Sequence, residues 1–220
     1  MKVFRELYLT GAPTDEGKLI EALEANLPRG WSRALDFEQR LNDDSHSRAY
    51  CFTCTAEEGR QAAALYLMPR TERSGLYVSN IVPQIEFSLD KDQYNAILSE
   101  FYRGAAAPAA TATGWSAEIT NDERPIEHWL GAEAAERLQS FSRLANKATG
   151  AAHPLDAERW QAFLISAHRA RASFDAALLN EWLRGQKWGD EEASRLAVEY
   201  EQGRDLLGAY DTYLRDHGHA

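Results

Sequence analysis

The pattern of hydrophobic and polar residues changes near residue 125. Before this point, short segments alternate between apolar and polar positions, as β-strands do when one face lies in a core. After it, apolar residues recur every three or four positions, which is typical of amphipathic α-helices. The pattern therefore predicts an α+β protein with a sheet in its N-terminal half and helices in its C-terminal half.

The first hundred residues contain several short elements separated by turn-forming residues. Residues 14–27 and 90–102 have helical periodicity, and Pro28 and Gly30 follow the first of them. The expected strands are residues 3–10, 31–37, 48–55, 62–68 and 76–82. Because a turn at residues 42–44 separates two of these strands, we expect a mixed, mostly antiparallel sheet layered with two helices.

The segment between the two halves is rich in small residues. Residues 105–113 are alanine and threonine with one proline, a composition that favours a linker, and residues 115–119 alternate like a returning strand. The expected organisation is therefore a sheet domain at 1–104, a linker or returning strand at 105–124, and a helical bundle at 125–220 packed on the sheet domain.

Four helices are expected after residue 125. The first enters through Pro125, the second has Asp156 as its N-cap, and the third begins near Asp175 and ends at Gly185. The last begins at Asp190 and runs nearly to residue 220. Four amphipathic helices can bury their apolar stripes in one shared core.

The net charge narrows the choice of partner. The chain has 34 acidic and 24 basic residues, a formal charge of −10, with no basic cluster longer than Arg169 to Arg171. Nucleic acid and membrane surfaces are therefore poor partners, whereas a basic protein is an allowed one. The chain shows neither an export signal nor a long uncharged apolar stretch, so we expect a cytoplasmic protein.

Neither the cysteines nor the histidines predict a metal or cofactor site. Cys51 and Cys54 lie in an alternating segment that directs them to opposite faces, so we expect buried free thiols. The histidines have no i,i+4 pairing and no Glu-x-x-His motif. They are His46, His128, His153, His168, His217 and His219. Glycine patterns that bind phosphate or dinucleotides are also absent from the sequence.

The connection between the first two C-terminal helices is the most unusual polar segment. A helix start offers free N–H groups, so an anionic ligand is one interpretation of this connection. The ligand-binding candidates are Asn146, Lys147, Thr149 and Arg159, with His153 as a catalytic candidate. The alternative is structural: Asn146 and Lys147 end one helix, Gly150 turns the chain, and Asp156 starts the next helix.

His168 is the second catalytic candidate. It shares the apolar stripe of its helix with Leu164 and Trp160, where Glu158 or Asp175 would orient it as a general base. The alternative is a core histidine with a satisfied hydrogen bond. The nearby arginines, which are Arg159, Arg169 and Arg171, would hold a carboxylate or phosphate or would simply be solvated.

The last helix is strongly acidic. Its eight acidic residues face only three basic ones, Arg195, Arg204 and Arg215. Such a ridge steers basic partners, and it is also what a solvated helix face looks like.

Two stretches resemble a family of bacterial cytosolic proteins that has no assigned function. The first comprises residues 77–83 and 92–98, and the second residues 145–160 and 163–168. The resemblance extends over about residues 76–211 and implies a bacterial origin. It implies no activity and no functional residues.

The absence of a catalytic motif and the acidic charge together favour a non-enzymatic interaction protein of an immunity or antitoxin kind that masks a basic partner. The alternative is a small-molecule enzyme or anion-binding protein that uses residues 146–159 and His168. The alternative requires these side chains to converge on one pocket.

Overall fold

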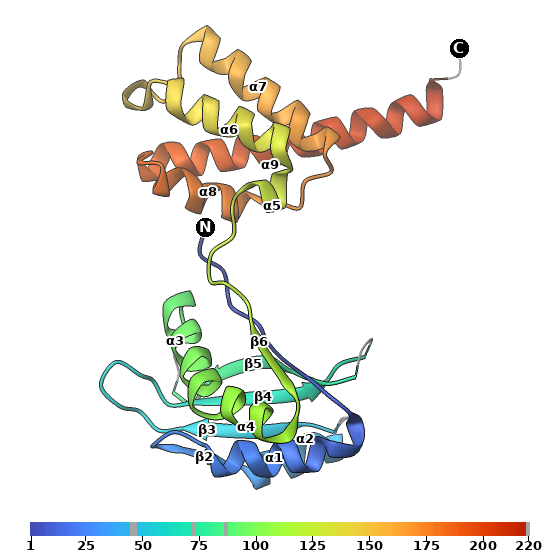
Figure 1. Ribbon diagram of the computed structural model, residues 1–220. Helices are drawn as coiled ribbons and strands as arrows, with labels where there is room; N and C mark the ends of the chain where they lie inside the picture. The colour runs from blue at the N-terminus through green and yellow to red at the C-terminus, as the bar shows by residue number, and fades with distance from the viewer. Residues whose placement is uncertain (45–47, 72–73, 86–87, 219–220) are drawn as a thin grey trace. The chain divides into compact units, whose positions relative to one another are not determined.

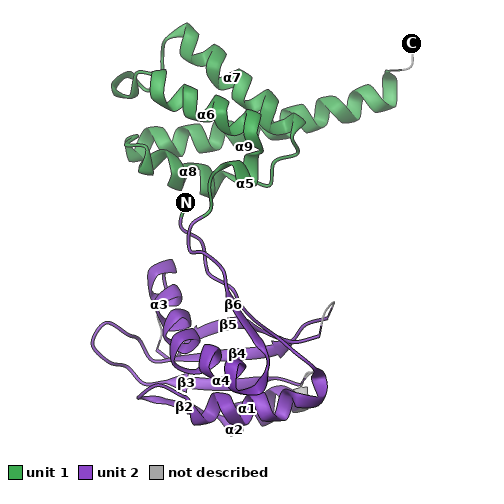
Figure 2. Ribbon diagram, viewed as in Figure 1, with its two compact units in different colours: residues 1, 124–220 green, residues 2–123 purple. Residues whose placement is uncertain are grey.

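The computed structural model describes residues 1–44, 48–71, 74–85 and 88–218 (Figure 1). It confirms the α+β class, with the sheet in the N-terminal half and helices in the C-terminal half. The chain forms two compact units, residues 2–123 and Met1 with residues 124–220 (Figure 2). The Met1 amino group donates to the Arg124 carbonyl at 2.8 Å, which places Met1 in the helical unit.

Within the described residues, six strands form one sheet in which every neighbouring pair is antiparallel. In spatial order they are β2 (Trp31–Arg33), β3 (Tyr50–Cys54), β4 (Ala63–Pro69), β5 (Leu76–Pro83), β1 (Leu7–Thr10) and β6 (Ser116–Ile119). β6 pairs with β1 along all four of its residues, so the chain returns to the sheet after its helices.

One face of this sheet carries the core of the N-terminal unit. Along β3, Tyr50, Phe52 and Cys54 belong to this core, and Cys51 lies on the opposite face because side chains alternate along a strand. The core face is covered by three helices, α1 (Glu16–Ala25), α3 (Lys91–Phe101) and α4 (Ala107–Thr113). The two predicted helices correspond to α1 and α3.

The segment expected to be a linker is helical. After α3, a π-helical turn at Tyr102–Ala106 leads directly into α4, and Ala105, Ala106 and Ala109 are fully buried. Alanine is the best helix former, and its small side chain allows close packing on α1. Pro108 has no N–H to donate, which accounts for the widened turn before it. The interpretation of 105–113 as a linker was therefore wrong.

A second correction concerns residues 31–44. The predicted strand at 31–37 ends at Arg33, and α2 (Leu35–Asp44) replaces both the rest of the strand and the turn expected at 42–44. The alternation that suggested a strand came from Leu35 and Phe37, which are exposed in α2. Apolar side chains on the surface produced a misleading pattern.

The C-terminal unit contains, in its described part, five α-helices. They are α5 (Glu127–Leu130), α6 (Ala132–Leu144), α7 (Pro154–Arg169), α8 (Ala176–Gly185) and α9 (Asp190–His217). The first predicted helix is divided at Gly131, whose φ of 73° favours glycine. The core is aromatic: Phe141 stacks on Trp188 at 5.4 Å, and Phe163 stacks on Tyr200 at 5.5 Å. No described helix is long and apolar enough to cross a membrane.

Candidate functional site

The polar connection between α6 and α7 is folded by its own side chains. Asn146 begins a 3-10 turn, Lys147–Thr149, and its Oδ1 accepts from the Ala148 N–H at 3.1 Å. The Thr149 hydroxyl donates to the Asn146 carbonyl at 3.3 Å, and Gly150 reverses the chain with a φ of 62°. Asn146 and Thr149 are therefore engaged in forming the turn.

The start of α7 differs from the prediction that Asp156 would cap it. The helix begins at Pro154, and His153 Nδ1 accepts from the Leu155 N–H at 3.2 Å, so His153 is the cap. Proline is favoured in the first turn because its missing N–H has no helical partner to lose. Asp156 lies within that turn, buried, and accepts from Arg159 Nη1 at 2.8 Å and from the Asn146 N–H at 3.4 Å.

The connection is also held to the end of α8 and to α9. Lys147 Nζ donates to the Gln186 carbonyl at 2.6 Å and lies 5.7 Å from the centre of the Trp188 ring. Arg195 donates to the Gly150 carbonyl at 2.8 Å. The candidate side chains of the segment thus have partners inside the fold, which supports its structural interpretation; they are Asn146, Lys147, Thr149, His153, Asp156 and Arg159.

His168 lies at the opposite end of α7 from His153. The two histidines are 15 residues apart, which corresponds to about 22 Å along a helix axis. His168 Nε2 contacts Asp211 Oδ2 at 2.8 Å, so its partner is a residue of α9 and neither Glu158 nor Asp175. The catalytic candidates therefore do not share a pocket.

A cleft of about 420 Å³ lies beside His168. Arg169 and Arg171 line it, as predicted for the vicinity of His168, and Arg204 reaches it from α9 while donating to the Phe174 carbonyl at 2.7 Å. Arg159, by contrast, lies near the other end of α7. The residues that line this cleft include no serine, cysteine or lysine that would act as a nucleophile.

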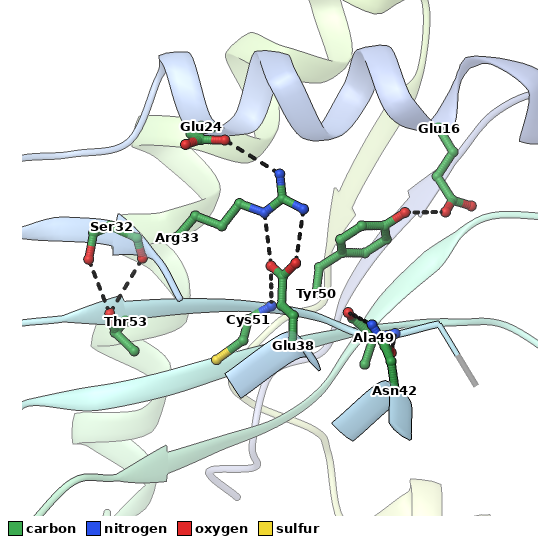
Figure 3. Close-up of polar contacts among 10 residues, drawn as sticks. All are labelled: Glu16, Glu24, Ser32, Arg33, Glu38, Asn42, Ala49, Tyr50, Cys51 and Thr53. Atoms are coloured by element: carbon green, nitrogen blue, oxygen red, sulfur yellow. Dashed lines mark hydrogen bonds and ion pairs between the residues drawn. The ribbon is translucent and has the colours of Figure 1, made fainter. Parts of the chain in front are cut away.

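The most buried charge pair among the described residues of the N-terminal unit was not predicted (Figure 3). Glu38 of α2 is buried and accepts from Arg33 Nε and Nη2, each at 2.9 Å, and from the Cys51 N–H at 3.0 Å. The two hydrogen bonds that Arg33 donates to Glu38 raise the pKa of Arg33 above its usual value. Because every charged atom of Glu38 is paired, the arrangement anchors α2 to the sheet and leaves no free base.

Tyr50 and the two cysteines complete this region of the sheet. The Tyr50 hydroxyl donates to Glu16 at 2.6 Å, and burial together with that bond raises the pKa of Tyr50 to about 12. Cys51 and Cys54 are buried and free, as predicted, and burial raises the pKa of Cys51 to about 11. A buried thiol with a raised pKa is a poor nucleophile.

No group of three or more histidine, cysteine, aspartate or glutamate side chains within the described ranges is arranged to hold a metal ion. His46 and His219 lie outside those ranges.

The C-terminal half of α9 carries the largest set of exposed apolar side chains on any described helix. Figure 1 shows that this half extends past the other four α-helices of its unit, α5, α6, α7 and α8. The exposed fractions are 70% for Leu206, 55% for Tyr210, 57% for Tyr213 and 43% for Leu214. Their spacing of three and four residues places them on one face of the helix, which we call the α9 face.

One flank of the α9 face is acidic. Glu201, Asp205 and Asp216 are four and eleven residues apart, so they lie along one side of the helix beside the apolar residues. Three of the eight residues of the predicted acidic ridge thus border the exposed apolar face. Of the others, Glu192 and Glu199 contact Arg195, and Asp211 contacts His168.

Comparison with known proteins gives no match: no protein family, no curated protein and no solved structure is similar to the chain. The resemblance to an uncharacterised bacterial family stays a prediction.

Proposed function

We propose that the protein is a non-enzymatic interaction module that binds a basic protein through the α9 face, in the manner of an immunity or antitoxin protein. The observation that carries the proposal is the exposed set Leu206, Tyr210, Tyr213 and Leu214. Contiguous exposed apolar patches that polar residues surround are typical of interaction surfaces.

The energetics of α9 support a partner. Burying one leucine side chain fully contributes about 1.5–3 kcal/mol. An isolated helical segment shorter than about 12–15 residues is only marginally stable in water. A partner that covers the α9 face would therefore stabilise the projecting half of α9 as well as bind to it. Helix-in-groove recognition uses anchors with this spacing.

The acidic flank determines which occupant fits. In an antiparallel two-fold pair, a second copy of the chain would bring Glu201, Asp205 and Asp216 of two helices together, and like charges across an interface cost free energy. A partner with lysine or arginine beside its apolar contacts would pair with the same flank. The charge of −10 on the whole chain adds long-range attraction for such a partner.

The alternative function, an enzyme or anion-binding protein built on residues 146–159 and His168, has less support. Asn146, Lys147, Thr149 and His153 have partners within the fold, and His168 lies at the far end of α7. We further propose a cytosolic location, because two buried unpaired cysteines are typical of a reducing compartment.

A defined peptide tests the interaction. The probe is a fluorescent amphipathic helical peptide with leucines on one face and lysines beside them, and the control peptide carries glutamates in place of the lysines. The full chain is expected to bind the lysine peptide, more weakly as salt is raised, and not to bind the glutamate peptide.

Matched variants locate the binding surface. Leu206→Ser combined with Tyr213→Ser should weaken binding at least tenfold, whereas Leu144→Ser combined with Leu155→Ser removes two exposed apolar residues from elsewhere and should leave it unchanged. Equal loss in both double variants, or equal binding of the glutamate peptide, would refute the proposal. A dimer of the free chain in sedimentation that Leu206→Ser combined with Tyr213→Ser dissociates would also refute it.

A further inference from the structure

A groove opens in the N-terminal unit where β1 and β5 separate. The two strands pair only at Tyr8 with Tyr77 and at Leu9 with Leu76. Beyond these pairs, residues 2–6 leave β5 and run beside residues 119–123, as the bridge between Lys2 and Glu123 shows. Residues 78–83 of β5 therefore have β4 on one side and no strand on the other within the described residues.

A buried side chain of α3 holds the groove open. Asn95 Oδ1 accepts from the Arg5 N–H at 2.8 Å, and Asn95 Nδ2 donates to the Val3 carbonyl at 2.8 Å. The Phe4 ring packs edge-on against Tyr94 at 5.0 Å. A buried amide with both ends bonded to backbone fixes the position of the N-terminal segment, so the separation from β5 is a built feature of the fold.

The groove has a volume of about 730 Å³, within the range of small-molecule sites. Four aromatic residues line it: Phe4, Tyr8, Tyr77 and Tyr94. Tyr8 and Tyr77 are directly paired across the strands, so their rings lie on the same face of the sheet. Aromatic side chains on several sides suit a flat unsaturated ring.

The free edge of β5 does not suit an added strand. The Ile81 N–H is bonded at 2.8 Å to the side-chain oxygen of its neighbour Asn80, and Pro83 has no N–H. Both features remove donors that an incoming peptide backbone would need. Recognition in the groove therefore depends on side chains.

Arg70 faces the groove and has no carboxylate partner among the residues that the structure describes. Arg70 Cζ lies 4.6 Å from the centre of the Tyr8 ring, and the guanidinium makes no hydrogen bond or ion pair among the described residues. The second arginine, Arg5, directs its guanidinium to the Thr120 carbonyl and the Ser99 hydroxyl. Glu6 at the rim has a partner of its own.

From this combination we infer that the groove binds a small ligand in which a flat aromatic ring carries one anionic group. The ring lies among Phe4, Tyr8 and Tyr77, and the anionic group pairs with Arg70. An arginine that stacks on an aromatic ring keeps its outer N–H donors free for a carboxylate or phosphate. This site is independent of the α9 face, because it lies in the other unit.

Three probes separate the contributions of ring and charge: indole-3-acetate carries both, tryptamine carries the ring with a positive charge, and acetate has no ring. Binding to the full chain is followed by amide NMR at Ser79 and Ile81. Indole-3-acetate is expected to bind with a dissociation constant on the order of 1 mM, as small ligands do, and the other two at least about fivefold more weakly.

Arg70→Gln should weaken indole-3-acetate binding about fivefold or more, and so should Phe4→Ala. The matched controls are Arg29→Gln, an exposed arginine outside the groove, and Phe37→Ala, a half-exposed ring of α2. Both should bind as the unaltered chain does. The inference is overturned if indole-3-acetate leaves the Ser79 and Ile81 signals unshifted, if tryptamine binds as well, or if Arg70→Gln has no effect.

Discussion

Removing the Glu38 carboxylate should destabilise the N-terminal unit strongly. Removing one member of a buried ion pair typically costs about 3–5 kcal/mol. Here the Arg33 side chain is 20% exposed and keeps a contact with Glu24 at 3.5 Å. Water and that second carboxylate therefore still stabilise the Arg33 charge in part when Glu38 is removed. We therefore expect Glu38→Ala to lower the free energy of unfolding by about 3 kcal/mol.

This loss of unfolding free energy can be measured by urea unfolding. Hydrogen exchange of peptides from each unit then follows the unfolding of the two units separately. With a dependence of about 2 kcal/mol per molar urea, the midpoint of the N-terminal unit should fall by about 1.5 M, while the helical unit keeps its own. Peptides from α2 should exchange fastest, because Glu38 is its buried anchor to the Cys51 N–H.

A double-mutant cycle with Arg33→Met isolates the pair. We expect a coupling free energy of about 2 kcal/mol, well above the value of about 0–1 kcal/mol for surface pairs. A coupling below about 0.5 kcal/mol, or equal destabilisation of both units, would refute the anchoring role of Glu38.

Three further predictions concern groups whose environment the structure defines. Both cysteines should resist a thiol reagent at pH 8 in the folded protein and react on unfolding, since they are buried and the pKa of Cys51 is raised to about 11. Fast labelling of the folded protein would contradict this prediction. The pKa of Tyr50 is raised in the folded state, so its stabilising contribution is complete below about pH 10 and is lost from there to about pH 12. Tyr50→Phe should make the unfolding free energy decrease less steeply with pH over that interval. An unchanged slope would contradict the prediction. Deleting residues 209–220 removes Asp211, the exposed partner of His168, and should change the stability of the helical unit by less than about 1 kcal/mol in thermal unfolding; a larger loss would mean that the end of α9 supports the core.

The parts of the fold that were predicted correctly are those in which local pattern and burial agree. The strands β3, β4 and β5 lie within one or two residues of their expected ranges, because their alternating side chains do face a core. Asp175 was predicted as the start of α8 and does cap it, accepting from the Leu178 N–H at 2.8 Å. Caps and alternation are local signals, so a single sequence contains them.

The errors arose where distant contacts decide the structure. α2 depends on Arg33 and Cys51 as partners of Glu38, and no periodicity reveals that network. The partner of His168 lies 43 residues away, and the residues that Asn95 holds lie about 90 residues before it. The fold of the whole unit brings such pairs together, so the spacing of residues along the sequence cannot predict them.

Amide hydrogen exchange along α9, with and without the lysine peptide, tests the interaction proposal most directly. In the free protein, residues 205–217 should exchange far faster than residues 190–200, whose Leu196 and Tyr200 are buried. Adding the peptide should slow exchange in residues 205–217 and leave residues 190–200 unchanged. Equal protection of both segments in the free chain, or protection by the peptide at another surface, would contradict the proposal that the α9 face is the binding surface.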